Sequence, residues 1–504
     1  MARTEHSSGT AEEVGAPRVQ SVDGQGTVVV WFRTDLRLSD NAALASAAAS
    51  GRPVACLFVL EESTPDTRPA GGAKRWWLHK SLAALRESLQ AIGGRLILRR
   101  GDALEQLLDV VNATDADAVV WSRRYGKGEI ESDRAIADAL RAEGVASHDL
   151  PGHLLHDPSR FRTKTGGHYK VYTPFWRQLA ATLDVGEPIE APRELRAAGG
   201  NLASDDLDDW ALLPTAPDWS GGIGKAWTAG ESGGRERLAA FVDGALEGYA
   251  EGRDIPAIDG TSRLSPHLAL GEVSPRQAWL ASEAADAPEG DREVFRKEIA
   301  WREFSYHLLH HHPDMPRENI DKAFDRFPWA EMDEAQRGRL RAWHRGRTGY
   351  PIVDAGMRQL WHIGWMHNRV RMITASFLIK HLLIDWRHGE EWFWDTLVDW
   401  DAANNSNGWQ WVAGSGADAA PFFRVFNPVL QGQKFDPAGD YVREWVPELA
   451  EVPAKHIHAP WDAPASVLAR AGVTLDRDYP APIVDHKAAR DRALAAYKTM
   501  KGKA

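Results

Sequence analysis

Short runs of β-branched and aromatic residues alternate with helical patterns between Thr27 and Leu150, and this alternation restricts the fold more than any other feature. The strand-like runs occupy residues 28–32, 54–60, 96–98 and 118–121. Segments between them, such as 75–92 and 129–143, are rich in Ala, Leu and charged residues at helical spacing. Such βαβ units build a parallel sheet that has helices on both faces. We therefore predict a Rossmann-like α/β domain over residues 27–155, with a five-stranded parallel sheet of which these runs supply four strands.

The loop after the first of these strands lacks a dinucleotide-binding fingerprint. It reads Arg33-Thr34-Asp35-Leu36-Arg37 in place of G-x-G-x-x-G. The glycines of that pattern allow a pyrophosphate to approach the backbone closely. This domain is therefore a poor candidate for binding a dinucleotide in the usual way.

The remaining chain differs in character on either side of a segment with weak periodicity. Residues 1–26 are polar and lack an apolar core, which predicts a disordered N-terminal arm and not a secretory signal. Residues 156–234 are rich in Pro, Gly, Asp and Trp, which indicates an interdomain connector. Beyond it, β-branched runs disappear and amphipathic patterns such as 292–311 and 356–383 dominate. We expect an all-α domain over residues 235–504.

The composition is typical of a soluble globular protein, with 43% hydrophobic and 26% charged residues. No run approaches the roughly 20 apolar residues of a membrane-spanning helix. Cys56 is the single cysteine, so no intramolecular disulfide can form, and we expect a cytoplasmic monomer. The net charge of −11 argues against a protein that coats nucleic acid, so any DNA contact must be a local basic patch.

The hexapeptide Gly260-Thr261-Ser262-Arg263-Leu264-Ser265 combines three hydroxyl groups with a guanidinium, just before Pro266. Proline favours the first turn of a helix. Hydroxyl and backbone N–H groups at a helix start can bind phosphate. A helix cap beside an exposed arginine explains the same residues equally well. Both interpretations stay open at this point.

Two later helical patterns place polar side chains on shared faces. Glu298, Trp301 and Arg302 fall at i, i+3 and i+4, so the indole belongs either to the core or to a stacking platform. Asn368 and Met372 fall at i and i+4, which suits a pocket for a neutral polar ring, although a buried core amide is the alternative.

Residues 399–411 contain two acids, three asparagines and three tryptophans, a density that packing alone hardly explains. Trp409 and Trp411 are two positions apart, so they point in different directions in a helix or a strand. One of them can face the core while the other faces the mouth of a ligand site.

The strings TSRLS, WREF, TGYPIVDAGMRQL, GWMHNRVRM and NNSNGWQW resemble those of the cryptochrome/photolyase family. WFRTDLRLSDN at 31–41 and FRVFNPVLQGQKFD at 423–436 match as well, so the resemblance covers nearly the whole chain. In its motifs the chain is most similar to class I cyclobutane pyrimidine dimer photolyases. The resemblance implies an N-terminal α/β antenna-type domain, a helical domain that binds folded-back FAD, and light-dependent repair of DNA containing pyrimidine dimers. A blue-light-sensing cryptochrome photoreceptor of the same fold is the alternative.

The resemblance also assigns residues to roles. FAD contacts are implied for Tyr249, Thr261, Ser262, Arg263, Leu264, Ser265, Arg371, Asp399, Asp401 and Asn405, with Asn405 facing flavin N5. Lesion and DNA contacts are implied for Arg253, Glu298, Trp301, Asn368, Arg369, Met372, Trp411 and Gln431. Relatives that repair the (6-4) photoproduct carry two histidines where this chain has Asn368 and Met372, so the cyclobutane dimer is the expected substrate.

The implied reaction begins when excited FADH⁻ donates an electron to the dimer. The two cyclobutane bonds then break and the electron returns, so there is no net redox change. Glu298 would donate a hydrogen bond to the dimer, for which we predict a pKa raised by burial. Trp329, Trp386 and Trp409 match the family's electron-transfer chain from the surface to the flavin.

A second, light-harvesting chromophore is common in this family, either a folate or a deazaflavin. Folate-binding relatives tend to have Asn-Glu where this chain has Gly128-Glu129, so the folate contact is only half present. A deazaflavin, a flavin or no second chromophore at all stay open. A light-independent flavin oxidoreductase is a further alternative, but the sequence shows no nicotinamide fingerprint.

Overall fold

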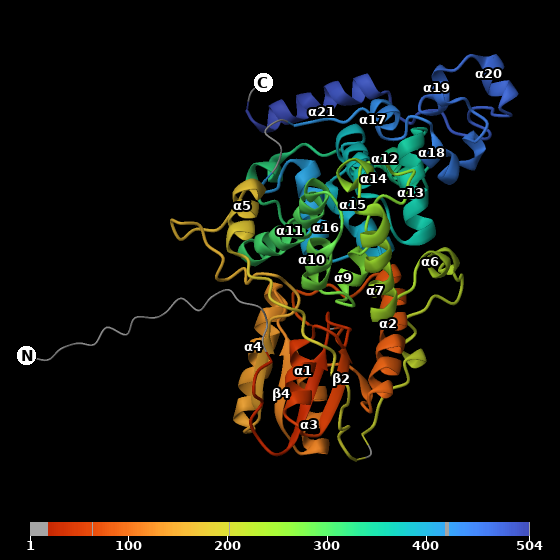
Figure 1. The fold of residues 1–504 in the computed structure, drawn as a ribbon. Coiled ribbons are helices and arrows are strands. Elements are labelled where there is room, and N and C mark those ends of the chain that lie inside the picture. The colour runs from red at the N-terminus through yellow and green to blue at the C-terminus, as the bar shows by residue number, and fades with distance from the viewer. Residues whose placement is uncertain (1–18, 63, 201, 419–422, 503–504) are drawn as a thin grey trace, which may run out of the picture.

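A computed structural model describes residues 19–62, 64–200, 202–418 and 423–502. The chain folds into an α/β part, drawn in red to orange, and a larger helical part, drawn in green to blue (Figure 1). Most of the predicted N-terminal arm lies outside the described residues. Residues 19–26 are packed and not disordered as predicted, because Val22 is buried and Arg52 donates hydrogen bonds to the carbonyl groups of Val22 and Asp23.

The α/β part contains the predicted five-stranded parallel sheet. Its strands are β1 (Thr27–Phe32), β2 (Val54–Leu60), β3 (Leu96–Arg100), β4 (Ala116–Ser122) and β5 (Ala146–Leu150), in the order β3-β2-β1-β4-β5. Helices α1 (Ala42–Ala49), α2 (Gly72–Ala91), α3 (Ala103–Thr114) and α4 (Lys127–Ala142) connect the strands. β1 and β2 are buried along their full lengths, which explains their continuous apolar runs.

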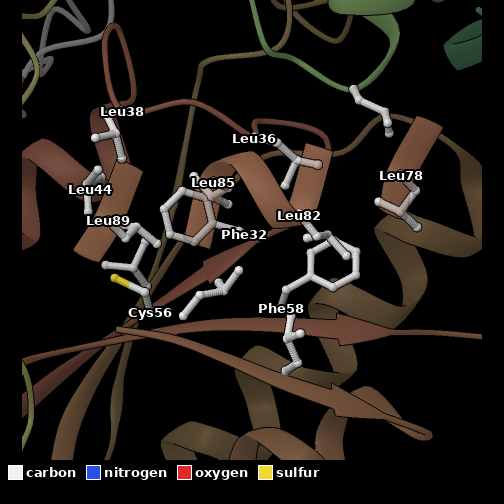
Figure 2. Close-up of a cluster of buried hydrophobic side chains, with 14 of the residues drawn as sticks. Phe32, Leu36, Leu38, Leu44, Cys56, Phe58, Leu78, Leu82, Leu85 and Leu89 are labelled. Carbon is white, nitrogen blue, oxygen red and sulfur yellow. The ribbon is translucent and has the colours of Figure 1, made fainter. Parts of the chain in front are cut away.

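The core on one face of the sheet joins the strands to α2 (Figure 2). Phe32, Cys56 and Phe58 from β1 and β2 pack in one cluster with Leu82 and Leu85 of α2. Burial raises the pKa of the Cys56 thiol to about 12, so this cysteine behaves as a core residue.

The segment predicted as a connector, 156–234, is partly helical. It contains α5 (Tyr172–Thr182), the 3₁₀ turn η1 (Asp208–Trp210) and α6 (Gly221–Ala226), and α7 (Glu231–Ala240) begins before its end. α5 packs on α11 (Glu289–His311) and buries Tyr172 and Phe175 in a cluster with Phe304 of that helix. Short amphipathic helices separated by Pro and Gly show little periodicity, which is why the sequence pattern missed them.

The helical part follows α7, and its central element is α16 (Ala402–Ala413), which packs against α11, α14 (Asn368–Ser376) and α15 (Trp386–Thr396). Its other longer helices are α10 (Pro275–Ala284), α12 (Glu334–His344), α13 (Pro351–Ile363), α17 (Pro428–Phe435) and α21 (His486–Met500). The shorter helices are α8 (Tyr249–Gly252), α9 (Ser265–Ala269), α18 (Asp440–Trp445), α19 (Ala454–Ile457) and α20 (Ala465–Arg470). Two π-helical turns, η2 (Phe241–Ala245) and η4 (Phe377–His381), and the 3₁₀ turns η3 (Lys322–Arg326), η5 (Pro447–Leu449) and η6 (Pro460–Asp462) complete it.

The amphipathic pattern over 356–383 is interrupted and does not form one helix. α13 ends at Gly364, which has φ +67° and lies in the left-handed region that favours glycine. The side chain of His367 then accepts a hydrogen bond from Arg369 N and caps α14. No helix in the described ranges combines the length and apolarity needed to cross a membrane.

Candidate active site

A buried carboxylate lies where α9, α14 and the start of α16 meet. Asp399 Oδ2 accepts hydrogen bonds from Ser265 Oγ at 2.6 Å and Arg371 Nη2 at 2.7 Å. Asp399 Oδ1 is buried and has no hydrogen-bond partner among the described residues. A buried acceptor without a partner fits a donor on a bound group. Asp401, two residues later, caps α16 by accepting from Asn404 N.

The loop at Gly260–Ser265 is held by a residue that the sequence pattern did not single out. Arg237 donates to the carbonyl oxygens of Thr261 and Ser262 and forms a bidentate pair with Asp259. Arg263 has φ +49°, which turns the chain into α9. Thr261 and Ser262 are partly exposed.

Two further residues of the predicted FAD set belong to one buried hydrophobic cluster. Leu264 is buried, and Tyr249 packs edge-on against Phe241 and Phe295. Burial raises the pKa of the Tyr249 hydroxyl and lowers that of Arg263. Tyr249 is therefore neutral at physiological pH.

The Asn405 amide is buried in α16 and oriented by α15. Its Nδ2 donates to Glu390 Oε1 at 2.8 Å and to the Glu390 carbonyl oxygen at 3.2 Å. Glu390 Oε2 in turn accepts from Arg68 Nη1 at 2.8 Å, and Arg68 precedes α2 in the α/β part. Burial raises the pKa of Glu390, while the positive charge of Arg68 lowers it. Sequence reasoning missed Glu390 and Arg68, because a contact between residues 322 positions apart has no local signal.

Trp301 on α11 has one ring face covered. The ring of Tyr172 stacks on it with centroids 3.7 Å apart and planes 6° apart. The Tyr172 hydroxyl donates to the Lys297 carbonyl oxygen at 2.7 Å. Trp301 is partly buried, so both sequence interpretations hold in part, with one face in the core and part of the ring accessible.

Glu298 lies one turn before Trp301 and pairs with Arg253. Its side chain is 30% exposed, so this carboxylate is only partly buried.

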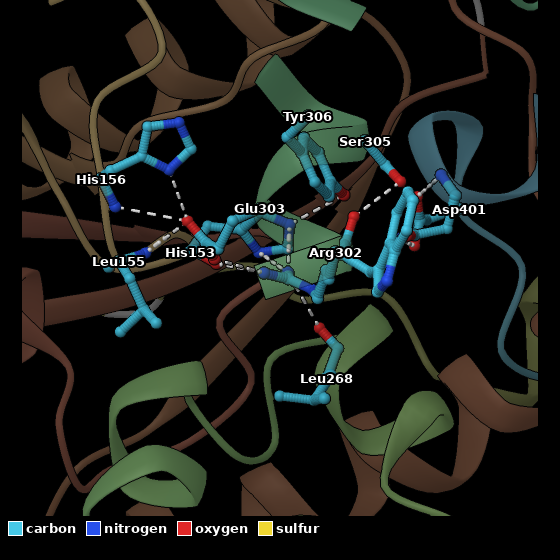
Figure 3. Close-up of polar contacts among 12 residues, drawn as sticks. His153, Leu155, His156, Leu268, Arg302, Glu303, Ser305, Tyr306 and Asp401 are labelled. Atoms are coloured by element: carbon cyan, nitrogen blue, oxygen red, sulfur yellow. Dashed lines mark hydrogen bonds and ion pairs between the residues drawn. The ribbon is translucent and has the colours of Figure 1, made fainter. Parts of the chain in front are cut away.

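Arg302 follows Trp301 on α11 but, unlike Glu298 and Trp301, it is buried. It is 7% exposed and donates to the His153 carbonyl oxygen at 2.9 Å. Glu303 beside it is fully buried and accepts from Leu155 N at 2.9 Å and from the His156 ring at 2.7 Å. Figure 3 shows this network between α11 and residues 153–156. It fixes α11 against the α/β part and thereby sets the position of Glu298 and Trp301.

The remaining members of the predicted lesion-facing set lie at or near the surface. Asn368 is exposed at the start of α14, and Met372, one turn later, is partly exposed. Trp411 on α16 and Gln431 on α17 are also partly exposed. α14 and α11 both pack against α16, the helix that carries Asn405 and Trp411.

Arg369 differs from the expectation of a free phosphate-binding residue. Its Nη2 contacts both carboxylate oxygens of Asp254, at 2.7 and 2.8 Å. Its guanidinium also lies 4.6 Å from the ring centroid of Phe435. In this structure the charge of Arg369 is therefore neutralised within the protein.

The three tryptophans of the predicted electron-transfer chain occupy a surface position and two core positions. Trp329 is partly exposed, whereas Trp386 and Trp409 are 0% and 2% exposed. Trp386 Nε1 donates to Asn319 Oδ1 at 3.0 Å. The Trp409 ring packs against Gly389 on α15, one turn after Trp386, and contacts the rings of Phe393 and Trp343.

The position that bears on a folate chromophore is crowded. A Cβ at Gly128 would lie 1.9 Å from the Pro65 carbonyl oxygen, so the asparagine of folate-binding relatives does not fit here. Glu129 Oε2 accepts from Gly126 N at 3.0 Å and caps α4. The Asn-Glu pair of folate-binding relatives is therefore only half present in this chain, through Glu129.

Comparisons with known proteins agree on one family. Residues 28–193 match a family model described as DNA photolyase, and residues 295–499 match one described as the FAD binding domain of DNA photolyase. A deoxyribodipyrimidine photo-lyase from Agrobacterium fabrum is 54% identical over 94% of this chain and 98% of its own length. Cryptochrome-1 from Arabidopsis thaliana is 38% identical over 94% of this chain and 70% of its own length. A bacterial class III photolyase structure from Agrobacterium tumefaciens superposes with a TM-score of 0.92 at 53% identity, covering 96% of this chain and 99% of that one.

Proposed function

The chain belongs to the DNA photolyase and cryptochrome family, and on that premise we propose that it repairs cyclobutane pyrimidine dimers in DNA with light absorbed by FAD. It is an enzyme of the deoxyribodipyrimidine photo-lyase type. The observation that supports the substrate assignment is that the exposed Asn368 and the partly exposed Trp301 and Met372 lie on helices that pack against α16, which carries the buried Asn405. Neutral groups at 368 and 372 favour the cyclobutane dimer over the (6-4) photoproduct.

The residues present fit FAD. Asp399 offers a buried acceptor, and Ser265, which bonds to it, follows a loop in which Thr261 and Ser262 are partly exposed. We assign FAD binding to these residues together with Tyr249, Arg263, Leu264, Arg371, Asp401 and Asn405. When bound and reduced, FAD supplies the electron that opens the dimer and receives it back, so atoms and electrons balance without a co-reactant.

The protein contributes binding and electrostatics to this reaction. A dimer extruded from the duplex would stack on the accessible part of Trp301 and on Trp411. The dimer carbonyl groups gain negative charge during the reaction, and the Asn368 amide and Arg253 can donate hydrogen bonds to them. Glu298 holds the Arg253 guanidinium at this face. A lesion is easier to unstack than intact bases, which favours damaged DNA.

A repair assay tests the proposal directly. The reduced protein is mixed with an oligonucleotide that contains a thymine dimer, and recovery of the thymine absorption is followed in blue light and in darkness. Recovery in light only, with no change in a (6-4) photoproduct oligonucleotide, is the expected result. A flavin-loaded protein that leaves the dimer intact in light would refute repair and favour the cryptochrome photoreceptor.

Paired substitutions on α11 test the role of Glu298. Glu298→Gln removes the charge facing Arg253, and repair by the reduced enzyme should fall. Glu293→Gln is the matched control, because Glu293 pairs with Lys297 on the same helix at 2.9 Å. Equal repair rates in both variants would exclude Glu298 from lesion binding.

A further inference from the structure

The acceptor groups around Asn405 fix which way its amide points. Both Nδ2 hydrogen bonds go to oxygens of Glu390, and a carboxylate or carbonyl oxygen only accepts. The two N–H groups must therefore face Glu390, and Oδ1 faces the opposite way. Among the described residues, none donates a hydrogen bond to Oδ1. Asn405 thus presents a fixed acceptor and not an interchangeable amide end.

Glu390 keeps the Asn405 amide in this orientation only while both of its oxygens that face the amide accept hydrogen bonds. The residue is 5% exposed, and burial favours the protonated carboxyl group. Arg68 opposes this by placing a guanidinium nitrogen 2.8 Å from Oε2. Without Arg68, a protonated Glu390 could donate to Asn405, and the amide would lose its single preferred orientation.

Arg68 is itself fixed by the contact between the two parts of the chain. Its guanidinium lies 4.0 Å from the ring centroid of Trp394, whose Nε1 donates to the Pro69 carbonyl oxygen at 2.8 Å. Gly71 lies against the backbone of Trp394, where a Cβ would come within 2.2 Å of the carbonyl oxygen. Gly72 N donates to Asp395 Oδ1 at 2.8 Å. The segment before α2 is therefore docked onto α15 with little freedom.

We propose that Arg68 is a positioning residue for the flavin site, which acts from the α/β part through Glu390 to present Asn405 Oδ1 to flavin N5. The inference rests on the proposed function, in which FAD binds with N5 at Asn405. Reduced flavin carries a hydrogen on N5 and oxidised flavin does not, so a fixed acceptor stabilises the reduced form. The contact between the two parts of the chain thereby tunes the flavin's redox equilibrium.

The midpoint potential of the bound FAD, measured by spectroelectrochemistry on the full-length protein, tests the proposal. Arg68→Gln should shift the equilibrium toward oxidised flavin about twofold to tenfold, the range expected for one hydrogen bond. At 29.6 mV per tenfold for a two-electron couple, this is about 10–30 mV. Arg68→Lys keeps the positive charge, so the midpoint potential of its bound FAD should stay close to the wild-type value. Arg75→Gln is the matched control, because Arg75 on α2 contacts the Ala211 carbonyl oxygen and not α15.

A double-mutant cycle separates positioning from a general structural effect. In an Asn405→Ala background, Arg68→Gln should leave the potential unchanged, because the acceptor is already gone. An equal shift in both backgrounds, or no shift when Asn405 is intact, would overturn the inference. Glu390→Gln gives a second route, since its new N–H donors allow the amide to turn, and it should shift the potential in the same direction. A wild-type protein that binds no FAD would instead refute the proposed function.

Discussion

Gly389 packs against a predicted electron-transfer residue so closely that a single methyl group must displace it. A Cβ at this position would lie 2.0 Å from Cη2, 2.5 Å from Cζ3 and 2.6 Å from Cζ2 of Trp409. Ordinary contact begins at 3.4 Å, so the ring or the helix must move by 3.4 − 2.0 = 1.4 Å. The indole is 2% exposed and packed among Phe393 and Trp343, so no free space accepts that movement.

The energetic cost follows from comparing two glycines. Overpacking a core costs about 1–3 kcal/mol, and three close contacts place Gly389→Ala at the upper end. Replacing a helical glycine by alanine stabilises the helix by about 1 kcal/mol, because alanine has the higher helix propensity. Gly408→Ala on α16 receives the same gain without the clash, because its Cβ would have no atom within 4 Å. The difference between the two variants isolates the overpacking.

In thermal unfolding followed by circular dichroism, the midpoint temperature of Gly389→Ala should therefore be about 2–6 °C below that of Gly408→Ala, at roughly 2 °C per kcal/mol. Displacing Trp409 should also slow photoreduction of oxidised FAD in Gly389→Ala, while Gly408→Ala reduces its flavin at the wild-type rate. Repair by an already reduced enzyme should be spared. The same unfolding midpoint temperature and the same photoreduction rate in Gly389→Ala and Gly408→Ala would refute the reasoning.

Other residues give independent tests. Tyr172→Leu removes the ring that stacks on Trp301, a contact worth about 0.5–1.5 kcal/mol. It should weaken dimer binding in the dark about twofold to tenfold, whereas Tyr172→Phe should not. Equal affinities of the two variants would contradict a supporting role for Tyr172. Burial lowers the pKa of His307 to about 2, so the unfolded chain takes up the proton first and stability falls as pH drops below about 6.5. His307→Gln should reduce the loss in free energy of unfolding by about 1.4 kcal/mol per pH unit, measured by urea unfolding at pH 7 and pH 5. The exposed His362→Gln is the control. The same pH dependence of the free energy of unfolding in His307→Gln and in the wild type would refute this prediction. Arg424 is exposed, and we expect it to contact a DNA phosphate. Arg424→Gln should then weaken binding of damaged and intact DNA alike and reduce the slope of log affinity against log salt concentration by about 0.9. Weaker binding of damaged DNA only would contradict a phosphate contact.

Local patterns in the sequence were sufficient for the sheet and for much of the helical part. β1 to β4 follow the apolar runs because both faces of a parallel sheet are buried, which leaves a continuous signal. The helices of 156–234 and the break at Gly364 escaped, because short helices and one left-handed residue leave little periodicity. The folate-type position at Gly128 also needed coordinates, since only the fold reveals the Pro65 carbonyl oxygen against it.

The sequence alone determined the kinds of groups available: the acid, amide and indole residues of 399–411, the hydroxyl cluster before Pro266, and neutral side chains at 368 and 372. Tertiary structure alone decided what those groups can do. It paired Glu298 with Arg253, committed Arg369 to Asp254 and turned Arg302 toward His153. Orientation, burial and charge pairing arise from segments far apart in the chain. These contacts follow from how helices pack, so spacing along one helix cannot encode them.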